Sequence, residues 1–536
     1  MNISLEILIV IIFISVFIII IFDNLFKQKI YTDLVSKMKF PKFSLKYFKI
    51  EVLNIFILFL IHFIFQSYYY KYESINWDIS SYLVASSDIL RLNVPYEYQW
   101  ESKQPFFYIL YSAIIILSNR NLIFFKILSD LYLFAIIVIL YFTLRKLSNK
   151  YLAFYGSLFY VVFMSQPWTS AEFSETYSLL FVGISYLIFL NSKNYFLIGA
   201  LVGLSGLINI GSSIFLLPYL LPLSLKIADT SSKNKLYKLL SSFALPHIIV
   251  ITFYTLRGSL NLYFETVFGI PASYSNQNFE FLNQVTVFLR SMFLYKSTLF
   301  ILIIYILSSM FLTFILERNK KVFQNFERIL FFLSSILFYY LAAHGYYHHL
   351  LFAIYFLTVL VTYFYNNSTR LIFYIFTIFL SSSVLTETYR TSFQVLTNLS
   401  EIYESYPLKN VSELIESRFD SEFSVLALDG VLTLYYLDKP NFSYIIHPSN
   451  HSEEFITEGL IDLGKIRKME VPKLVDEEPD VILCSNNDLI NCEIYDYKQN
   501  YEEIDVLSTR QNPYLQFYDK QSFNLRLFIK NGGNKK

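Results

Sequence analysis

The sequence predicts an α-helical, multi-pass membrane protein with about 11 to 13 spans, followed by a small C-terminal α/β domain. The chain of 536 residues is 55% hydrophobic but only 16% charged, whereas soluble domains are about one quarter charged. Apolar runs as long as a hydrocarbon core is thick, about 20 residues, recur as far as Thr386. After Glu387 the chain turns acidic, and its apolar runs shrink to strand length, as at 424–428 and 481–484.

Basic loops predict which side of the membrane each connection faces, because lysine and arginine concentrate in cytoplasmic loops. The stretch 23–50 is rich in lysine, and later basic clusters follow at 145–150, 226–238 and 318–328. Crossing the membrane between these clusters requires spans at 5–22, 52–69, 122–144, 151–164, 177–190, 239–256, 297–316, 330–343, 350–365 and 371–386.

Two apolar runs depart from this alternation. The run 105–117 has only about 13 residues, a length typical of interfacial or re-entrant segments, and the parity of the basic loops requires it to lie on the outer membrane surface. The run 195–225 is too long for one span and is interrupted by Gly206, Asn209 and Gly211. We therefore expect it to form two half-spans.

These assignments divide the chain into three parts. Residues 1–50 form a span and a basic cytoplasmic loop; the run that opens this part lacks the basic start and the cleavage site of a signal peptide. Residues 51–387 form the main transmembrane domain, and residues 388–536 form an extracytoplasmic α/β domain. Parity places four connections of the transmembrane domain outside the cytoplasm, namely 70–121, 165–175, 257–296 and 344–349.

Composition argues against several functions. The net charge of +1 provides no clustered basic surface of the kind that nucleic acid requires. The only cysteines, Cys484 and Cys492, provide neither a disulfide framework nor a zinc pattern. The turn Asp429-Gly430 lacks the glycine pattern of a phosphate-binding loop, which argues against a nucleotide site there.

The first outer loop holds the densest set of polar and aromatic residues. Asp78 follows a span among aromatic side chains, and Lys103 stands alone before the run 105–117. A carboxylate in this position can act as a general base on a hydroxyl group, and a lysine is a natural phosphate ligand. The alternative interpretation is structural, since tryptophan and tyrosine line membrane interfaces in general.

A series of motifs continues from this loop in a fixed order. In chain order they are Asp78, Tyr82, Pro95-Tyr96, Lys103-Gln104-Pro105, Arg145-Lys146, Glu172 to Glu175, and His344 to His349. This order resembles that of GT-C glycosyltransferases, and within them the family 39-like branch of the protein O-mannosyltransferases and the lipid A aminoarabinose transferases. The chain has Asp78-Ile79 where that branch usually has Asp-Glu, and Lys103-Gln104-Pro105 where it usually has Lys-Pro-Pro.

The resemblance implies a glycosyltransferase that moves a sugar, with inversion, from a polyprenyl-phosphate carrier to an acceptor hydroxyl on the extracytoplasmic face. Asp78 would deprotonate the acceptor, and Glu175 would orient it. Lys103 would bind the donor phosphate and stabilise its departure. Further candidates are His348, His349 and Arg257 for the phosphate, and Tyr82, Tyr96 and Glu172 for the sugar or the acceptor.

The same residues also have structural interpretations. Acidic residues favour the first turn of a helix, histidines occur at span entrances, and an arginine at a span end usually extends its charge to the interface. Whether Glu172 or Glu175 is the second acidic residue therefore stays open. So do the sugar, the acceptor (a lipid, a glycan or a protein) and a divalent metal requirement. No cofactor motif or metal-ligand spacing is evident in the sequence.

Two other functions fit a protein of this class. A transporter or flippase of a lipid-linked sugar needs ionisable residues near the midplane and broken helices, for which Lys126, Asp130 and the interruption 206–211 are candidates. A polymerase or ligase of surface polysaccharide would tend to carry arginines in a large outer loop. Polar residues crowd the outer loops instead, which favours the transferase. We expect Lys126 and Asp130 to form a buried pair, and Asp88 and Arg91 an ordinary surface pair.

Overall fold

The computed structural model of the protein describes residues 45–73, 77–164, 171–277, 326–341, 347–364, 391–419, 422–485, 500–508 and 524–531. The expected spans 5–22, 297–316 and 371–386 lie outside the described residues, as does the expected domain boundary at 387. Parts of the expected outer loops 165–175, 257–296 and 344–349 also lie outside them.

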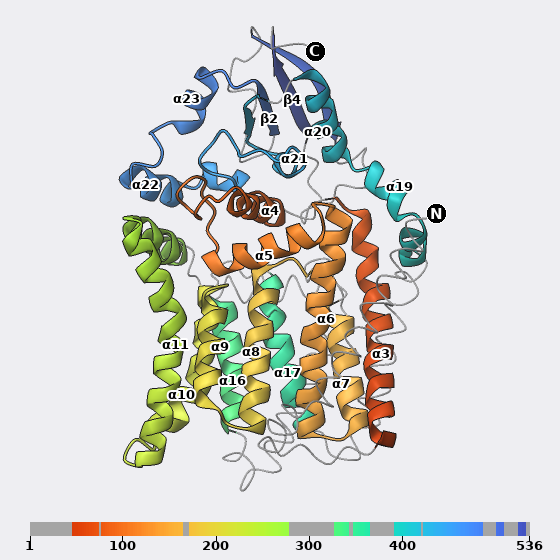
Figure 1. Cartoon of the computed structure of the whole chain (residues 1–536), viewed down its shortest axis with the longest axis vertical. Helices are drawn as coiled ribbons and strands as arrows, with labels where there is room; N and C mark the ends of the chain where they lie inside the picture. The colour runs from red at the N-terminus through yellow and green to blue at the C-terminus, as the bar shows by residue number, and fades with distance from the viewer. Residues whose placement is uncertain are drawn as a thin grey trace.

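Apolar helices packed side by side form the membrane part of the molecule (Figure 1). They are α3 (Leu45–Ser67), α6 (Leu122–Leu147), α7 (Lys150–Phe163), α8 (Ser174–Asn191), α9 (Tyr195–Gly206), α10 (Leu217–Ser224), α11 (Thr230–Leu256), α16 (Phe326–Leu341) and α17 (Leu351–Phe364). Among the described residues, three helices are long and apolar enough to cross a membrane alone, over Ile50–Lys71, Leu122–Leu147 and Thr230–Leu256. The expectation of a helical membrane protein is therefore confirmed.

The expected interruption after α9 is present. Helix α9 ends at Gly206, and a 3₁₀ helix, η3 (Ile210–Leu216), leads into α10. The Asn209 side chain caps η3 by accepting a hydrogen bond from the Gly211 N–H at 3.1 Å. Asn209 therefore has a fixed place between the two half-spans.

Glycines allow α9 and α11 to pack closely. A Cβ atom added at Gly199 would lie 2.2 Å from the Leu239 carbonyl oxygen, and one added at Gly203 would lie 2.5 Å from that of Phe243. Two small residues four apart on one helix face permit such an approach. A larger side chain at either position would push the helices apart and displace the end of α9.

Helix α11 begins earlier than the sequence analysis expected. It starts at Thr230 because the Asp229 side chain caps it by accepting hydrogen bonds from the Ser231 and Ser232 N–H groups. Most of the basic stretch 226–238, which we expected to be a loop, is therefore the first part of this helix. The lysines keep their place at one end of the bundle, so the parity argument is unaffected.

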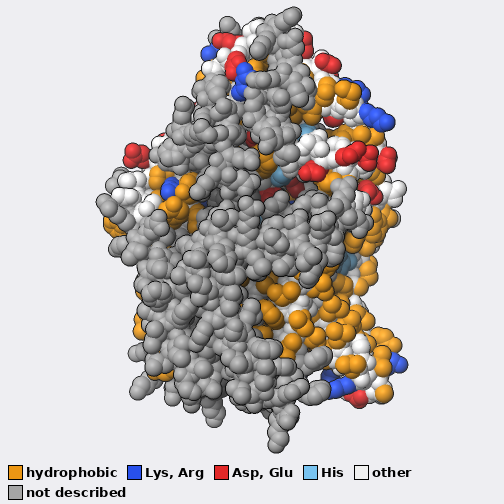
Figure 2. All heavy atoms as spheres, turned by 180° about the vertical axis from the view of Figure 1, so that it is seen from behind, with side chains coloured by type: hydrophobic (Ala, Val, Ile, Leu, Met, Phe, Trp, Pro, Cys, Tyr) orange, Lys and Arg blue, Asp and Glu red, His pale blue; other side chains and the backbone are white. Residues whose placement is uncertain are grey.

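Helix α11 also presents apolar side chains to its surroundings. Figure 2 shows hydrophobic side chains covering one flank of the bundle, with charged side chains toward its two ends. Leu245, Ile248, Ile249 and Phe253 are among the exposed hydrophobic residues of this helix. Hydrocarbon tails are the surroundings that such a surface fits.

Two helices lie across one end of the bundle (Figure 1). The first is α4 (Trp77–Leu90), which follows α3 and the short η1 (Tyr68–Lys71). The second is α5 (Pro105–Leu117), whose bounds are those of the apolar run that we expected to lie on the membrane surface. Proline is its first residue, where no backbone N–H is needed. Helix α5 lies across the end of the bundle (Figure 1), as we expected for a helix on the membrane surface.

Lys126 and Asp130, which we expected to pair with each other, bond instead to η1 and the residues after it. Tyr70 donates from its hydroxyl to Asp130 Oδ2 at 2.5 Å, and the Lys126 ammonium donates to the Tyr72 carbonyl. All of these side chains are buried. The two charged residues therefore join α6 to the segment that leads into α4.

The expected Asp88–Arg91 pair is confirmed, but it is not a surface pair. Arg91 Nη1 lies 2.5 Å from Asp88 Oδ1, and Asp88 is 6% exposed. Arg91 and Arg120 both contact Asp438 of the C-terminal part. The spacing predicted the pair correctly, whereas the burial comes from the C-terminal part that covers it.

The remaining described elements are a short helical segment after α11, the turn η6 before α17, and the elements of the C-terminal part. The helices are α12 (Leu260–Phe264), η4 (Glu265–Gly269), α13 (Ile270–Gln277), η6 (Tyr347–Leu350), α19 (Leu399–Glu404), α20 (Pro407–Arg418), α21 (Leu432–Tyr436), η7 (Pro448–His451), α22 (Glu454–Asp462) and α23 (Glu470–Asp476). The strands are β1 (Val425–Ala427), β2 (Val481–Ser485), β3 (Tyr501–Ser508) and β4 (Asn524–Lys530). The expected strands 424–428 and 481–484 are confirmed as β1 and β2, whereas β3 and β4 were not predicted.

The four strands form one mixed sheet in the order β1-β2-β4-β3. Strand β1 is parallel to β2, with Leu426 opposite Ile482, and the other pairs are antiparallel. Alternate residues such as Val425 and Leu483 belong to the same hydrophobic core as α4 and α5, while Leu426 and Ile482 pack on the other face. Cys484 is disulfide-bonded, although the sequence analysis expected no disulfide framework.

Backbone hydrogen bonds fix the C-terminal domain on the first outer loop. The Trp100 N–H donates to the Tyr444 carbonyl at 2.7 Å, and the Ile446 N–H donates to the Trp100 carbonyl at 3.2 Å. The Glu73 carboxylate accepts hydrogen bonds from the Leu408 and Lys409 N–H groups in the first turn of α20. A carboxylate at a helix N-terminus stabilises it by about 0.3–1 kcal/mol. The domain is therefore docked against the loop that holds Asp78 and Lys103.

Candidate active site

Polar side chains from distant parts of the sequence meet between the bundle and the C-terminal domain. They are Asp78 in α4, Lys103 before α5, Glu175 in α8, His348 and His349 in η6, and His447 at the start of η7. Their charges influence one another's protonation, so they form one electrostatic cluster. On the face shown in Figure 2, acidic and histidine side chains are set back beneath the upper domain.

Asp78 lies in the first turn of α4 and pairs with His447 of the C-terminal domain. The distance between Asp78 Oδ1 and His447 Nε2 is 3.4 Å. The neighbouring Trp77 packs edge-on against the His447 ring, and its Nε1–H donates to Asp429 Oδ1 at 2.9 Å. Asp429 also accepts a hydrogen bond from the Ser485 hydroxyl at the end of β2. The C-terminal domain thus positions both Asp78 and Trp77.

The neighbouring charges keep Asp78 ionised. Burial raises its pKa, but the hydrogen bond and charge of His447 and the charge of Lys103 outweigh burial, so the pKa of Asp78 lies below its usual value. Burial lowers the pKa of His447, but Asp78 and then Glu101 raise it above its usual value. These effects favour the pair in which Asp78 is ionised and His447 is protonated. The Asp78 side chain is 32% exposed, which leaves it accessible to a substrate.

Tyrosines hold Lys103 in place. The Tyr96 hydroxyl donates to the Lys103 carbonyl at 2.5 Å, and the Lys103 N–H donates to the Tyr108 hydroxyl oxygen at 2.9 Å. The Lys103 ammonium lies 5.5 Å from the centre of the Tyr82 ring, within the range of a cation–π interaction. The structure therefore places Tyr82 against the lysine charge, while Tyr96 supports the lysine backbone.

The charges of three carboxylates act on the Lys103 ammonium. Burial lowers its pKa, but Glu175, Asp78 and Glu101 raise it above its usual value, so Lys103 stays charged. Glu101 is buried, and its Oε1 accepts hydrogen bonds from the N–H and hydroxyl of Ser102 at 2.6 and 2.9 Å. Burial raises the pKa of Glu101, while His447 and Lys103 oppose this effect.

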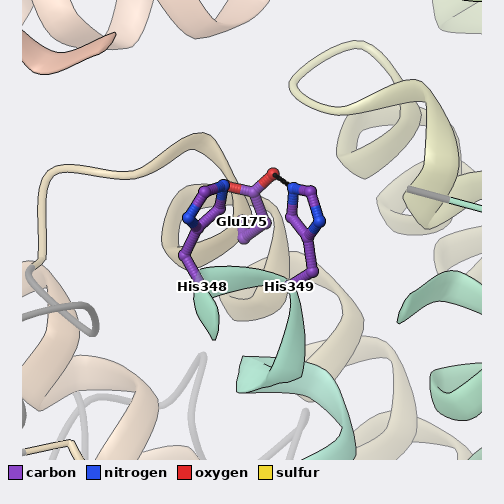
Figure 3. A group of neighbouring side chains, drawn as sticks. All are labelled: Glu175, His348 and His349. Carbon is purple, nitrogen blue, oxygen red and sulfur yellow. Dashed lines mark ion pairs between the residues drawn. The ribbon is translucent and has the colours of Figure 1, made fainter. Parts of the chain in front are cut away.

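Glu175 forms the buried side of the cluster. It is 1% exposed, and its Oε1 accepts a hydrogen bond from Asn209 Nδ2 at 2.8 Å. The Ser174 hydroxyl donates to its Oε2 at 3.2 Å. His349 Nε2 lies 3.5 Å from Glu175 Oε1, as the dashed line in Figure 3 marks. The interruption after α9 therefore supplies a side chain, Asn209, that holds the acidic residue in the first turn of α8.

Two other candidates contact different residues. The charge of Glu172 acts on Lys126 and Asp130 in α6, and its backbone carbonyl accepts a hydrogen bond from Tyr111. Arg257 pairs with Glu97, with Arg257 Nη2 2.6 Å from Glu97 Oε2. Of the two acidic residues that the sequence left open, Glu175 is the one in the cluster with Lys103.

Sequence reasoning missed three residues of the cluster. His447 lies in the C-terminal domain, and no local pattern linked it to a loop hundreds of residues earlier. Glu101 precedes the Lys103 motif and could have been noted as an acidic neighbour of the proposed phosphate ligand. Asn209 was identified only as part of a helix interruption, although an interrupted helix is a common place for polar contacts.

The comparison of structures identifies the fold. ArnT from Cupriavidus metallidurans bound to undecaprenyl phosphate matches with a TM-score of 0.57 and 9% sequence identity, over 90% of this chain and 99% of that one. The chain has the GT-C fold of ArnT. The apo form of the same ArnT matches with a TM-score of 0.52 and 10% identity, over 81% of this chain and 92% of the ArnT chain.

The likeness to ArnT confirms the fold that the order of motifs predicted. At 9% identity it shows the fold alone. No family model matches the sequence, and no curated protein is significantly similar to it. The function must therefore be argued from the cluster itself.

Proposed function

We propose that this protein is a membrane glycosyltransferase that moves a sugar from a polyprenyl-phosphate donor to an acceptor hydroxyl. The observation that carries this proposal is the pairing of an accessible, ionised Asp78 with His447, beside a charged Lys103. A carboxylate next to fixed cations provides both a base and a binding site for a phosphate leaving group. The ArnT structure with the same fold contains undecaprenyl phosphate, which supports a donor of this class.

The donor phosphate is proposed to bind Lys103 and His447. Nearby carboxylates raise the pKa values of both side chains, which favours their cationic forms. A phosphate in this position gains charge as the bond to the sugar breaks, and fixed cations stabilise that charge. Helix α5 begins directly after Lys103, and its exposed Ile109, Ile116 and Leu117 suit contact with the lipid tail.

Asp78 is proposed to accept the proton of the acceptor hydroxyl. In the free protein His447 and Lys103 hold the pKa of Asp78 low, which makes it a weak base. A phosphate that binds these two cations adds a negative charge next to Asp78, and a nearby like charge raises a carboxyl pKa. Donor binding therefore shifts Asp78 toward the range in which a general base is effective. Attack of the acceptor oxygen on the anomeric carbon, opposite the departing phosphate, inverts that centre.

Glu175 is proposed to support the site from behind. Its burial and its hydrogen bonds with Asn209 and Ser174 favour contact with Lys103 and the histidines over contact with an acceptor. Tyr82, which faces the Lys103 charge, is the stronger of the two tyrosine candidates for a role beside the sugar. The roles of Tyr96, Glu172 and Arg257 are proposed to be structural.

The site and the C-terminal domain are proposed to lie outside the cytoplasm. The basic loops support this orientation, since they place the opposite end of the bundle in the cytoplasm. The disulfide at Cys484 also supports it, because disulfides persist in oxidising compartments. An epitope tag after Lys536 that is accessible only from the cytoplasm would contradict this orientation.

The transporter alternative gains no support from its candidate residues. Lys126 and Asp130 bond to η1 and the residues after it, and the interruption after α9 directs Asn209 to Glu175. These polar groups therefore hold the transmembrane part together and support the cluster at its end. A solute pathway would require them to face a cavity.

Variants of Lys103 test the proposed function. Lys103→Ala should raise the apparent KM for the donor, because a charge-assisted bond to phosphate is lost. Lys103→Arg should keep part of the activity, because the charge remains with a different hydrogen-bond geometry. The measurement is the rate of sugar transfer at a series of donor concentrations. An unchanged donor KM in Lys103→Ala would contradict the assigned phosphate site, and transport without any transfer product would contradict the enzyme.

A further inference from the structure

Three potential metal ligands come together from two distant segments. Glu175 lies in the first turn of α8, whereas His348 and His349 are consecutive residues of η6. One ligand atom from each residue lies within 4.8 Å of the other two. In Figure 3 the Glu175 carboxylate lies between the two imidazole rings. We propose that Glu175, His348 and His349 bind a divalent transition-metal ion, with Zn²⁺ as the best fit.

The spacing fits such an ion. Ligand atoms about 2.1 Å from a tetrahedral metal lie about 3.4 Å from each other. His349 Nε2 and Glu175 Oε1 are 3.5 Å apart, so this pair already has the required separation. The largest separation in the set, 4.8 Å, needs only small side-chain rotations to close.

Neighbouring residues hold the ligands in place. Asn209 and Ser174 donate hydrogen bonds to the two oxygens of Glu175, which fixes the orientation of the carboxylate. The His348 ring stacks on Phe173, with ring centres 4.3 Å apart and planes 4° from parallel. The His349 ring packs edge-on against Phe338. Such outer contacts orient the ligands of protein metal sites.

The ligand chemistry selects the class of metal. Two imidazoles and one carboxylate suit zinc and its neighbours in the transition series, whereas Mg²⁺ and Ca²⁺ prefer oxygen ligands. Sites with two histidines, one glutamate and an open position occur in zinc enzymes. The positive charge of Lys103 acts on His349 and weakens cation binding, while Asp78 acts on the same histidine with the opposite sign.

A site of this kind escapes a sequence search. Zinc motifs are recognised from ligands a few residues apart, and here only the two histidines are neighbours. The alternative is a buried ion pair between His349 and Glu175 that holds η6 against α8. Such a pair needs no third ligand, and it predicts no metal in the protein.

The place of the ion suggests its use. The three ligands belong to the same cluster as Lys103, on which the charge of Glu175 acts, so a metal there would add positive charge next to the donor phosphate. This role rests on the proposed function. Metal binding itself does not, and the experiment therefore measures binding directly.

The experiment uses the full-length protein, purified in detergent through a tag without histidine and stripped with a chelator. Co²⁺ is added while the visible absorption of the bound ion is recorded, and retained zinc is measured by elemental analysis. The wild type should bind one Co²⁺ per chain, and Glu175→Gln and His349→Gln should abolish the absorption band. Asn209→Ala keeps all three ligands but removes a supporting hydrogen bond, so it should weaken binding by about 10- to 100-fold.

A matched control is His451→Gln, which removes a half-buried histidine outside the three-residue set and should leave Co²⁺ binding unchanged. Zinc should also raise the unfolding temperature of the wild type and of His451→Gln, because a ligand of the native state stabilises it. No Co²⁺ band in the wild type, or equal binding by wild type, Glu175→Gln and Asn209→Ala, would overturn the proposal. Each of these results can be read whether or not the protein transfers sugar.

Discussion

Replacing His447 should change the pH dependence of the reaction. The variant to be tested is His447→Gln, which removes the positive charge next to Asp78 but keeps a polar side chain of similar length. At the observed separation of 3.4 Å, two unit charges attract by about 1 kcal/mol in bulk water and by about 5 kcal/mol at an effective dielectric constant of 20. The Asp78 side chain is 32% exposed, so the lower part of this range applies.

This energy translates into a shift of the Asp78 pKa. One pKa unit corresponds to about 1.4 kcal/mol, so losing the His447 charge should raise the pKa of Asp78 by about 1 to 2 units. Asp78 must be deprotonated to act as a base. A higher pKa means that protonation, and with it the loss of activity, begins at a higher pH. On the alkaline side, wild-type activity should fall as His447 loses its proton, and the variant should lack this decline.

The assay is kcat at saturating donor between about pH 4 and about pH 9, because kcat reports the donor complex, in which the bound phosphate raises the pKa of Asp78. The control is His451→Gln, at the end of the turn η7 that His447 precedes. It should leave the pH dependence unchanged, because Asp78 pairs with His447. Unfolding temperatures at each pH separate a change in catalysis from a change in stability. An acidic decline at the same pH in wild type and His447→Gln would refute the role assigned to the pair.

Two further substitutions test the proposed base and the docking of the C-terminal domain. Asp78→Asn should lower kcat by about 10²- to 10⁴-fold while leaving the protein folded. Its control, Asp88→Asn, keeps an acceptor for Arg91 and should leave kcat nearly unchanged. Equal losses of kcat in the two variants, measured as initial rates, would contradict the mechanism. Trp77→Phe removes the hydrogen bond to the ionisable Asp429 and should cost roughly 1.5–3 kcal/mol, measured as a lower unfolding temperature. A midpoint equal to that of the wild type would show that Trp77 does not help to dock the domain.

Local sequence features predicted the transverse helix α5 in full. Its bounds, Pro105–Leu117, are those of the apolar run, because a proline opens it and residues with positive φ, Asn119 and Arg120, follow its end. The interruption after α9 was equally visible in the glycines and Asn209. Both features depend on residues that are close together in the chain.

Contacts between distant segments could not be predicted in the same way. His447 meets Asp78 only because the C-terminal sheet shares a core with α4 and α5. Glu172 and Glu175 look alike in the sequence, but Glu172 precedes α8 whereas Glu175 lies in its first turn, and packing decides which of them acts on Lys103. Arg91, the partner of Asp88, likewise meets Asp438 only because the C-terminal domain is docked.

The most direct test of the account is to follow a labelled donor. Purified protein in lipid vesicles, as wild type and as Asp78→Asn, is incubated with a set of radiolabelled polyprenyl-phosphate sugars and with candidate lipid, glycan and protein acceptors. The account predicts that the wild type moves label from one donor class to an acceptor and releases the polyprenyl phosphate, and that Asp78→Asn does neither. Label that crosses the vesicle membrane while still attached to its lipid, in both proteins, would contradict it.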